Sequence, residues 1–586
     1  MKTYQKGVLF FAVFLLFSCS TNKQKKESVD DVYAINEIKM DESTQHAPPP
    51  PPMQAQTEIQ ESKIQISVSD VQGTNDKYEV DVAELREHKV IVEEDCEQAF
   101  YYAPQANAHD RQRNEEYSQF VENKFKMAQE EPLSTFSVDV DAASYSNMRR
   151  FINKGELPYK DAIRIEELIN YFSYNYAEPT GDDPVRIITE VGSCPWNSQN
   201  RLVRIGLKAK DIASDNLPAS NFVFLIDVSG SMEGPTRLEL VKSSLKLLVN
   251  NLRKKDRVAI VVYSGAAGEA LPSTSGDNKQ KIKESLDNLS AGGSTAGGAG
   301  IQLAYKIAKQ NFIKNGNNRI ILCTDGDFNV GVSNNKGLEK LIEEERKTGV
   351  FLSILGYGMG NYKDSKMQTL AQAGNGNHAY IDNLQEANKV LVNEFGATMY
   401  TVAKDVKLQI EFNPTRVQAY RLVGYETRLL NKEDFNDDTK DAGEMGAGHT
   451  VTAFYEVVPV GVKSKSLANV DPLKYQKNDI SPISKALSTH PELLTVKLRY
   501  KQPNGDTSKK IEVPLIDSNK NNVSEDFRFA SAVAMFGQLI KDSEYKGDGT
   551  FDKAIALAKE GYGNDEQGYR REFVRLMETA KGLSKN

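Results

Sequence analysis

Residues 221–232 read Asn-Phe-Val-Phe-Leu-Ile-Asp-Val-Ser-Gly-Ser-Met, an apolar run that ends in a carboxylate and two hydroxyls. The run does not alternate between apolar and polar residues, which indicates a strand buried on both faces of a parallel sheet. Residues 257–263, 320–323 and 351–355 are similar apolar runs, and segments with helical spacing of apolar residues separate them. The sequence therefore predicts a doubly wound, mostly parallel α/β domain.

Hard oxygen donors follow the strands of this predicted sheet. They are Asp227, Ser229 and Ser231 after the first strand, Thr295 at the start of a helix, and Asp325 after a later strand. Ligands bind outside the carboxyl ends of parallel strands, so we expect these side chains to meet at one edge. Two carboxylates and three hydroxyls, without His or Cys, suit Mg²⁺ or Mn²⁺. The sequence therefore predicts a divalent-cation site.

These five donors, together with the run Thr-Asp-Gly at 324–326, resemble the metal-ion-dependent adhesion site of von Willebrand factor type A domains. The resemblance implies a Rossmann-like fold in which Ser229 and Ser231 coordinate the cation directly. Asp227, Thr295 and Asp325 would bind directly or through water. One coordination position would stay open for a carboxylate of a protein partner.

Motifs outside this domain resemble a broader family. They are Ser-Val-Asp-Val-Asp-Ala-Ala-Ser-Tyr at 137–145, Arg-Ile-Glu-Glu-Leu-Ile-Asn-Tyr-Phe at 164–172, Thr-Asp-Gly-Asp-Phe-Asn-Val-Gly at 324–331 and Asp-Ala-Gly-Glu-Met-Gly-Ala-Gly-His-Thr at 441–450. In these motifs the chain is similar to YfbK-like bacterial lipoproteins over residues 132–586. The resemblance implies an N-terminal segment, a type A domain and a distinct C-terminal domain.

The first 19 residues have the layout of a bacterial signal peptide. Lys2 and Lys6 precede an apolar run at 8–17, which is about half the roughly 20 residues that cross a bilayer. Leu-Phe-Ser-Cys at 16–19 resembles a lipobox, which implies cleavage before Cys19 and lipid on its thiol. The alternative is an ordinary signal peptide in which the cysteine is incidental. We expect a protein anchored by lipid in the bacterial cell envelope, at the outer membrane or the periplasmic face.

Composition and periodicity divide the chain into seven segments. We expect a signal peptide at 1–18, a disordered tether with five consecutive prolines (48–52) at 19–131, and an N-terminal helical segment at 132–180, with order beginning near Pro132. Asp141 is predicted to cap the first helix. The type A domain is expected at 218–400 and a C-terminal helical segment at 523–586. Strand-like runs at 181–217 and 401–522 predict one β-sandwich interrupted by the type A domain.

Charge and motif content exclude several classes of function. The formal net charge is −8, from 73 Lys and Arg against 81 Asp and Glu, which disfavours nucleic-acid binding. Four cysteines exclude a disulfide-dense scaffold, although pairing of Cys96 with Cys194 stays open. The chain lacks G-x-S-x-G, Walker A and H-E-x-x-H sequences. Gly356-x-Gly358-x-Gly360 lacks the third glycine of the dinucleotide-binding pattern G-x-G-x-x-G at its proper spacing, so we expect a turn there.

The sequence thus favours a non-enzymatic, membrane-anchored binding protein that recognises a protein partner through a metal-bridged carboxylate. Two other interpretations stay open, a scaffold or assembly factor for envelope complexes with an ancillary metal site, and a hydrolase that activates water on the metal. A helix expected over 387–401 would join the metal-binding edge to the β region. We expect partner binding to shift that helix.

Overall fold

The computed structural model describes residues 115–294, 297–326, 335–360, 362–396, 400–440, 442–464, 467, 491–503, 505–517 and 522–584. The expected signal peptide with Cys19, the prolines at 48–52, Cys96 and Thr295 lie outside these residues. Within the described ranges, no helix is both long enough and apolar enough to cross a membrane.

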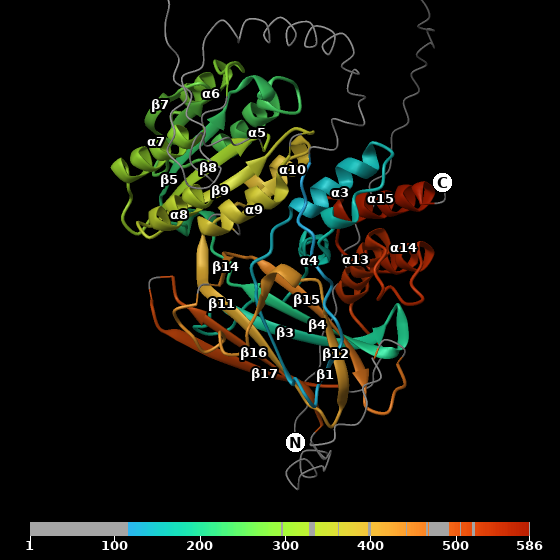
Figure 1. The fold of residues 1–586 in the computed structure, drawn as a ribbon. Helices are drawn as coiled ribbons and strands as arrows, with labels where there is room; N and C mark the ends of the chain where they lie inside the picture. The colour runs from blue at the N-terminus through green and yellow to red at the C-terminus, as the bar shows by residue number, and fades with distance from the viewer. Residues whose placement is uncertain are drawn as a thin grey trace, which may run out of the picture. The chain divides into compact units, whose positions relative to one another are not determined.

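The central domain contains a six-stranded sheet in the order β10-β9-β8-β5-β6-β7 (Figure 1). The strands are β5 (Ser220–Asp227), β6 (Arg257–Tyr263), β7 (Ala267–Ser275), β8 (Asn317–Thr324), β9 (Val350–Gly356) and β10 (His378–Tyr380). All neighbouring pairs are parallel except β6 and β7, which are antiparallel. The predicted mostly parallel sheet is therefore confirmed, and the two edge strands β7 and β10 are additions to it.

Helices cover both faces of this sheet, as the apolar runs of the strands predict. One face packs on α5 (Leu238–Asn250), α6 (Lys279–Asp287) and α10 (Leu384–Asn388), and the other on α7 (Gly297–Gln310), α8 (Asn335–Arg346) and α9 (Asp364–Ala373). Along β5, Phe222 and Phe224 face the first layer and Val223 and Leu225 face the second. Alternate side chains of one strand thus enter two different cores, because successive side chains point to opposite faces.

Two antiparallel sheets lie beyond this domain (Figure 1). The first sheet contains, in spatial order, β1 (Lys126–Met127), β12 (Val417–Val423), β15 (Thr450–Pro459), β4 (Asn197–Ala209) and β3 (Val185–Cys194). The second sheet contains, in spatial order, β13 (Leu429–Leu430), β2 (Leu133–Ser137), β11 (Thr401–Phe412), β16 (Glu492–Lys501) and β17 (Ser508–Ile516). The short strand β14 (Gly443–Gly446) also pairs with β11. Ile205 of β4 pairs with Ala453 of β15, so strands from both sides of the type A segment share a sheet. Phe412 stacks on Tyr420 between the two sheets. The predicted β-sandwich-like region with an inserted α/β domain is confirmed.

Five helices form a third cluster with its own apolar core. They are α3 (Ala143–Asn153), α4 (Ile165–Asn170), α13 (Glu525–Lys541), α14 (Phe551–Glu560) and α15 (Tyr569–Leu583). Tyr145 of α3 stacks on Tyr171 after α4, and Phe172 contacts Phe529 of α13 edge-on. The N-terminal and C-terminal helical segments, far apart in sequence, therefore make one helical layer. Short single turns lie at Lys160–Ala162, Ser214–Asn216 and Glu426–Arg428.

Two expectations about local structure are wrong. Order begins before Pro132, because β1 pairs with β12 and Glu115 forms an ion pair with Arg150 at 2.7 Å. Asp141 does not cap α3, whose N-cap is Ala142, since the Asp141 carboxylate bonds to partners outside that helix. The helix expected over 387–401 is irregular, because α10 continues into a π-helical turn, Lys389–Asn393, before residues 395–396 are again helical, and β11 begins at Thr401.

Candidate metal centre at the edge of the type A sheet

The loop after β5 carries the first three candidate ligands. The strand ends at Asp227, and the chain then forms a single 3₁₀ turn, Gly230–Met232, for which Ser229 is the N-cap. The hydroxyl oxygens of Ser229 and Ser231 lie 3.1 Å apart. Ser229 is buried and Ser231 is half-buried. The tight turn therefore brings two hydroxyls of a D-x-S-x-S motif onto one side of the loop.

The carboxylate of Asp227 is held from three sides. Its Oδ1 accepts a hydrogen bond from the backbone N–H of Ser229 at 2.9 Å. Its Oδ2 accepts bonds from the hydroxyls of Tyr263 at 3.1 Å and Thr324 at 3.2 Å. Burial raises the pKa of Asp227, and the negative charge of Asp325 raises it further, while the bonds from Ser229 lower it. A nearby cation would relieve this electrostatic cost, because an opposite charge favours the ionised carboxylate.

The loop that leads to Thr295 lies against the loop after β5. The N–H of Gly230 donates to the carbonyl of Gly293 at 3.0 Å, and the N–H of Gly292 donates to that of Val228 at 2.8 Å. Gly293 has a φ of +82°, a conformation that glycine adopts at low cost. Thr295 itself is outside the described residues. Its chain neighbours nevertheless lie beside the residues with which it is predicted to act.

Asp325 follows β8 and is 1% exposed. The turn after it uses Gly326 at a φ of +100°, and the N–H of Gly326 donates to the Thr324 hydroxyl at 3.2 Å. Nε of Arg237 lies 3.9 Å from Asp325 Oδ2. Because β8 and β5 are parallel neighbours, Asp325 emerges at the same edge of the sheet as Asp227. The structure thus brings four of the five predicted ligands to this edge.

The described donors fit a hard divalent cation. Two buried carboxylates that repel each other stand beside two hydroxyls, and oxygen-only donor sets suit Mg²⁺ or Mn²⁺. Across the described ranges, no group of three or more His, Cys, Asp or Glu side chains is arranged to hold a metal.

Sequence reasoning missed Tyr263 and the side-chain role of Thr324. Both side chains contact Asp227 from the strands that flank β5. In the register of the sheet, Tyr263 is the direct partner of Asp227. The signal was present, since Tyr263 is the last residue of an apolar run that the sequence already assigned to a strand. Aligning the ends of the predicted strands would have placed it beside Asp227.

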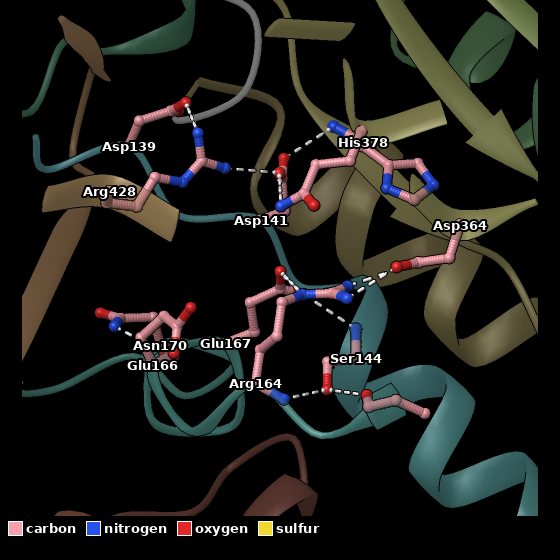
Figure 2. Close-up of polar contacts among 12 residues, drawn as sticks. Asp139, Asp141, Ser144, Arg164, Glu166, Glu167, Asn170, Asp364, His378 and Arg428 are labelled. Carbon is pink, nitrogen blue, oxygen red and sulfur yellow. Dashed lines mark hydrogen bonds and ion pairs between the residues drawn. The ribbon is translucent and has the colours of Figure 1, made fainter. Parts of the chain in front are cut away.

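A second polar cluster joins the type A domain to the N-terminal segment and to the β region (Figure 2). Arg164 contacts Asp364 of α9 at 2.6 Å and also pairs with Glu167. In the same cluster, the guanidinium of Arg428 lies 2.8 Å from the carboxylate of Asp139 and 3.0 Å from that of Asp141. These pairs are mostly buried, so loss of either partner would leave an uncompensated charge. The sequence did not predict this cluster, because the partners of Arg164 and Arg428 include residues that are distant in the chain, such as Asp364 and Asp139.

The α/β domain that carries the candidate metal centre matches a known family. Residues 221–394 match the family model described as von Willebrand factor type A domain. The chain thus contains a type A domain, and residues 111–204 match a model described as von Willebrand factor. Residues 397–583 match the model described as uncharacterized protein YfbK, C-terminal. The chain belongs to the YfbK family: it is 46% identical over 475 residues to the uncharacterized protein YfbK of Escherichia coli (strain K12), covering 80% of this chain and 81% of that protein.

Other similarities cover less of the chain or are weaker. The uncharacterized protein sll0103 of Synechocystis sp. is 28% identical over 193 residues, which is 32% of this chain and 44% of that protein. Among solved structures, a von Willebrand factor type A protein from Catenulispora acidiphila has a TM-score of 0.36 at 15% identity, covering 78% of this chain and 91% of that chain. BatB from Bacteroides thetaiotaomicron has a TM-score of 0.27 at 23% identity, covering 30% of this chain and 97% of that chain.

Proposed function

We propose that this protein is a non-enzymatic binding protein whose type A domain recognises an acidic side chain of a protein partner through a bound Mg²⁺ or Mn²⁺. The observation that carries the proposal is the convergence of Asp227, Ser229 and Asp325 at one sheet edge. Asp227, Ser229, Ser231, Asp325 and Thr295 would hold the cation. A cation held partly by uncharged hydroxyls retains positive charge, which attracts a carboxylate. The surrounding loops would select the partner by shape.

We also propose that lipid on Cys19 anchors the protein in the bacterial cell envelope. The lipobox-like run at 16–19 and the apolar run before it support this placement. Labelling cells with a fatty-acid analogue tests it, because label should enter the wild-type protein and should be lost in Cys19→Ser. Ser18→Ala, which keeps the cysteine, is the matched control. Equal labelling of wild type and Cys19→Ser would reject the anchor.

The metal site is tested by calorimetric titration of Mg²⁺ and Mn²⁺ into the full-length protein in detergent. Wild type should bind one equivalent saturably, and Asp227→Ala should lose that binding. Asp277→Ala is the control, because Asp277 is an exposed aspartate of the same domain. Absence of binding to the wild type would contradict the proposal.

A second experiment separates recognition from scaffolding. Partners are captured from envelope extracts by wild type and by Asp227→Ala, each in Mg²⁺ and in EDTA. A partner that is recovered only by wild type in Mg²⁺ supports recognition through the metal. An unchanged partner set in Asp227→Ala would instead favour a scaffold in which the metal site is ancillary.

A further inference from the structure

Arg319 is a buried cation whose pairing differs from that of other buried arginines. It is the third residue of β8 and is 3% exposed. Its Nη1 donates to the hydroxyl of Ser353 at 2.7 Å, and its guanidinium lies 5.6 Å from the ring centroid of Phe351. Its Nε is buried and has no hydrogen-bond partner among the described residues. A neutral hydroxyl and an aromatic face are therefore direct contacts of this guanidinium.

The remaining buried arginines of the described residues each contact a carboxylate. They are Arg149, Arg150, Arg164, Arg204, Arg421, Arg428 and Arg570. For Arg319, by contrast, no carboxylate of the described residues lies within 4.0 Å. Burial lowers the pKa of Arg319 to about 10. Burying an unpaired charge is costly, so such a residue needs an explanation.

Arg319 lines a cavity of about 220 Å³ between the type A domain and the β region. Asn375 and Asn377, in the loop before β10, line it from the type A side, and Thr401 and Glu444 line it from β11 and β14. Amide and hydroxyl groups therefore surround the guanidinium. Such groups donate or accept hydrogen bonds as a polar ligand requires.

Two acidic side chains share this cavity, and both have hydrogen-bonding partners of their own. Glu444 accepts bonds from the Thr401 hydroxyl at 2.6 Å and from the Asn375 amide at 3.3 Å. The second acid, Asp139, pairs with Arg428, as Figure 2 shows. Neither of these carboxylates lies within ion-pair distance of Arg319. Glu444 acts on Arg319 through its negative charge without an ion pair, so direct pairing with the guanidinium is left for a group that enters the cavity.

We propose that this cavity binds a small molecule bearing a carboxylate or phosphate group, which pairs with the guanidinium of Arg319. The planar guanidinium presents paired N–H donors that match both kinds of oxyanion. The polar walls hold the remainder of a compact, hydrophilic ligand. The ligand would lie between the type A domain and the β region.

The proposed anion site is separate from the candidate metal centre. Arg319 stands near the start of β8, whereas Asp325 follows its last residue. Six residues of extended chain separate two points by roughly 20 Å. An anion on Arg319 and a cation at the other edge therefore occupy opposite ends of the same strand, and each can be tested without the other.

The test is calorimetric titration of sodium acetate and inorganic phosphate into the full-length protein in EDTA, with sodium chloride at matched ionic strength as reference. EDTA removes divalent cations, so binding of acetate to a metal does not contribute. We expect saturable binding of at least one of the two anions. Tighter binding of acetate would identify the anionic group of the ligand as a carboxylate. Tighter binding of inorganic phosphate would identify it as a phosphate.

Variants assign the binding to Arg319. Arg319→Met should weaken binding by tenfold or more, and Arg319→Lys, which keeps a charge but loses the planar donors, should weaken it less. Arg257→Met is the matched control, because Arg257 begins β6, another core strand of the same sheet, and contacts Ser273 instead of the cavity. Unchanged binding in Arg319→Met would overturn the proposal. Absence of saturable binding of both anions to wild type would overturn it even if the variants fail to fold.

Discussion

The hydroxyl of Tyr263 donates a hydrogen bond to Oδ2 of Asp227 across 3.1 Å, between two residues paired in the register of parallel strands β6 and β5. Thr324, on the opposite flanking strand, donates to the same oxygen at 3.2 Å. The carboxylate is therefore oriented from both sides by rigid elements of the sheet. Such support would orient the carboxylate for a cation at the candidate metal centre.

Tyr263→Phe should weaken Mg²⁺ binding by roughly tenfold, because loss of a hydrogen bond to a ligand carboxylate typically reduces metal affinity by about 10-fold to 100-fold. Calorimetric titration measures the change. Tyr305→Phe is the control, since the buried hydroxyl of Tyr305 has no hydrogen-bond partner among the described residues. Equal affinities in wild type and Tyr263→Phe would show that the hydroxyl does not support the site.

Gly300→Ala should destabilise the protein by about 1–3 kcal/mol, because the new methyl group would overpack a buried contact. A Cβ at Gly300 in α7 would lie 2.9 Å from Cβ of Tyr263. Alanine normally favours a helix over glycine by about 0.5–1 kcal/mol. Gly582→Ala in α15, where a Cβ would meet nothing within 4 Å, should therefore stabilise the protein. Urea unfolding compares the two, and a stabilising effect of Gly300→Ala would contradict the packing argument.

Arg149→Gln should cost about 3–5 kcal/mol, the usual effect of breaking a buried ion pair. Arg149 lies 2.7 Å from Glu386 of α10 and 3.3 Å from Glu572 of α15, so it joins the last helix of the type A domain to the C-terminal layer. Hydrogen exchange of the backbone amides should accelerate at 384–393 in this variant. A shift of this helix on partner binding would have to break the contact between Arg149 and Glu386. Lys553→Gln, which removes an exposed pair with Asp548, should cost about 0–1 kcal/mol. Similar losses in both variants would reject the assigned role.

His378→Gln should make the protein less sensitive to acid. Burial lowers the pKa of His378, although the carboxylates of Asp364 and Glu167 oppose that shift. The folded state therefore binds this proton more weakly than the unfolded state, and stability is lost as the pH falls below about 6.5. Between about pH 8 and pH 5, wild type should therefore lose more stability than the variant. Identical losses in urea unfolding at the two pH values would contradict the prediction.

Local patterns were sufficient to predict much of the fold. The uniform apolar runs predicted the core strands of the type A sheet, because a strand buried on both faces needs apolar residues at every position. The edge strand β7 has several half-buried or exposed residues and lacks such a run. The short strand β10 contains only three residues. Edge strands leave a weaker signal, since one side of each lacks a neighbour and burial is less complete.

The sequence by itself predicted the oxygen donors of the candidate metal centre, because these donors follow strand ends in one recognisable order. Its assignment of Asp141 as a helix cap was wrong, because tertiary contacts with His378 and Arg428 replaced the local bond. Only the tertiary structure decided which distant charges pair and that Arg319 faces a cavity without a carboxylate at ion-pair distance. Ion pairs and cavities depend on distances between segments remote in the chain, and spacing along the sequence does not encode those distances.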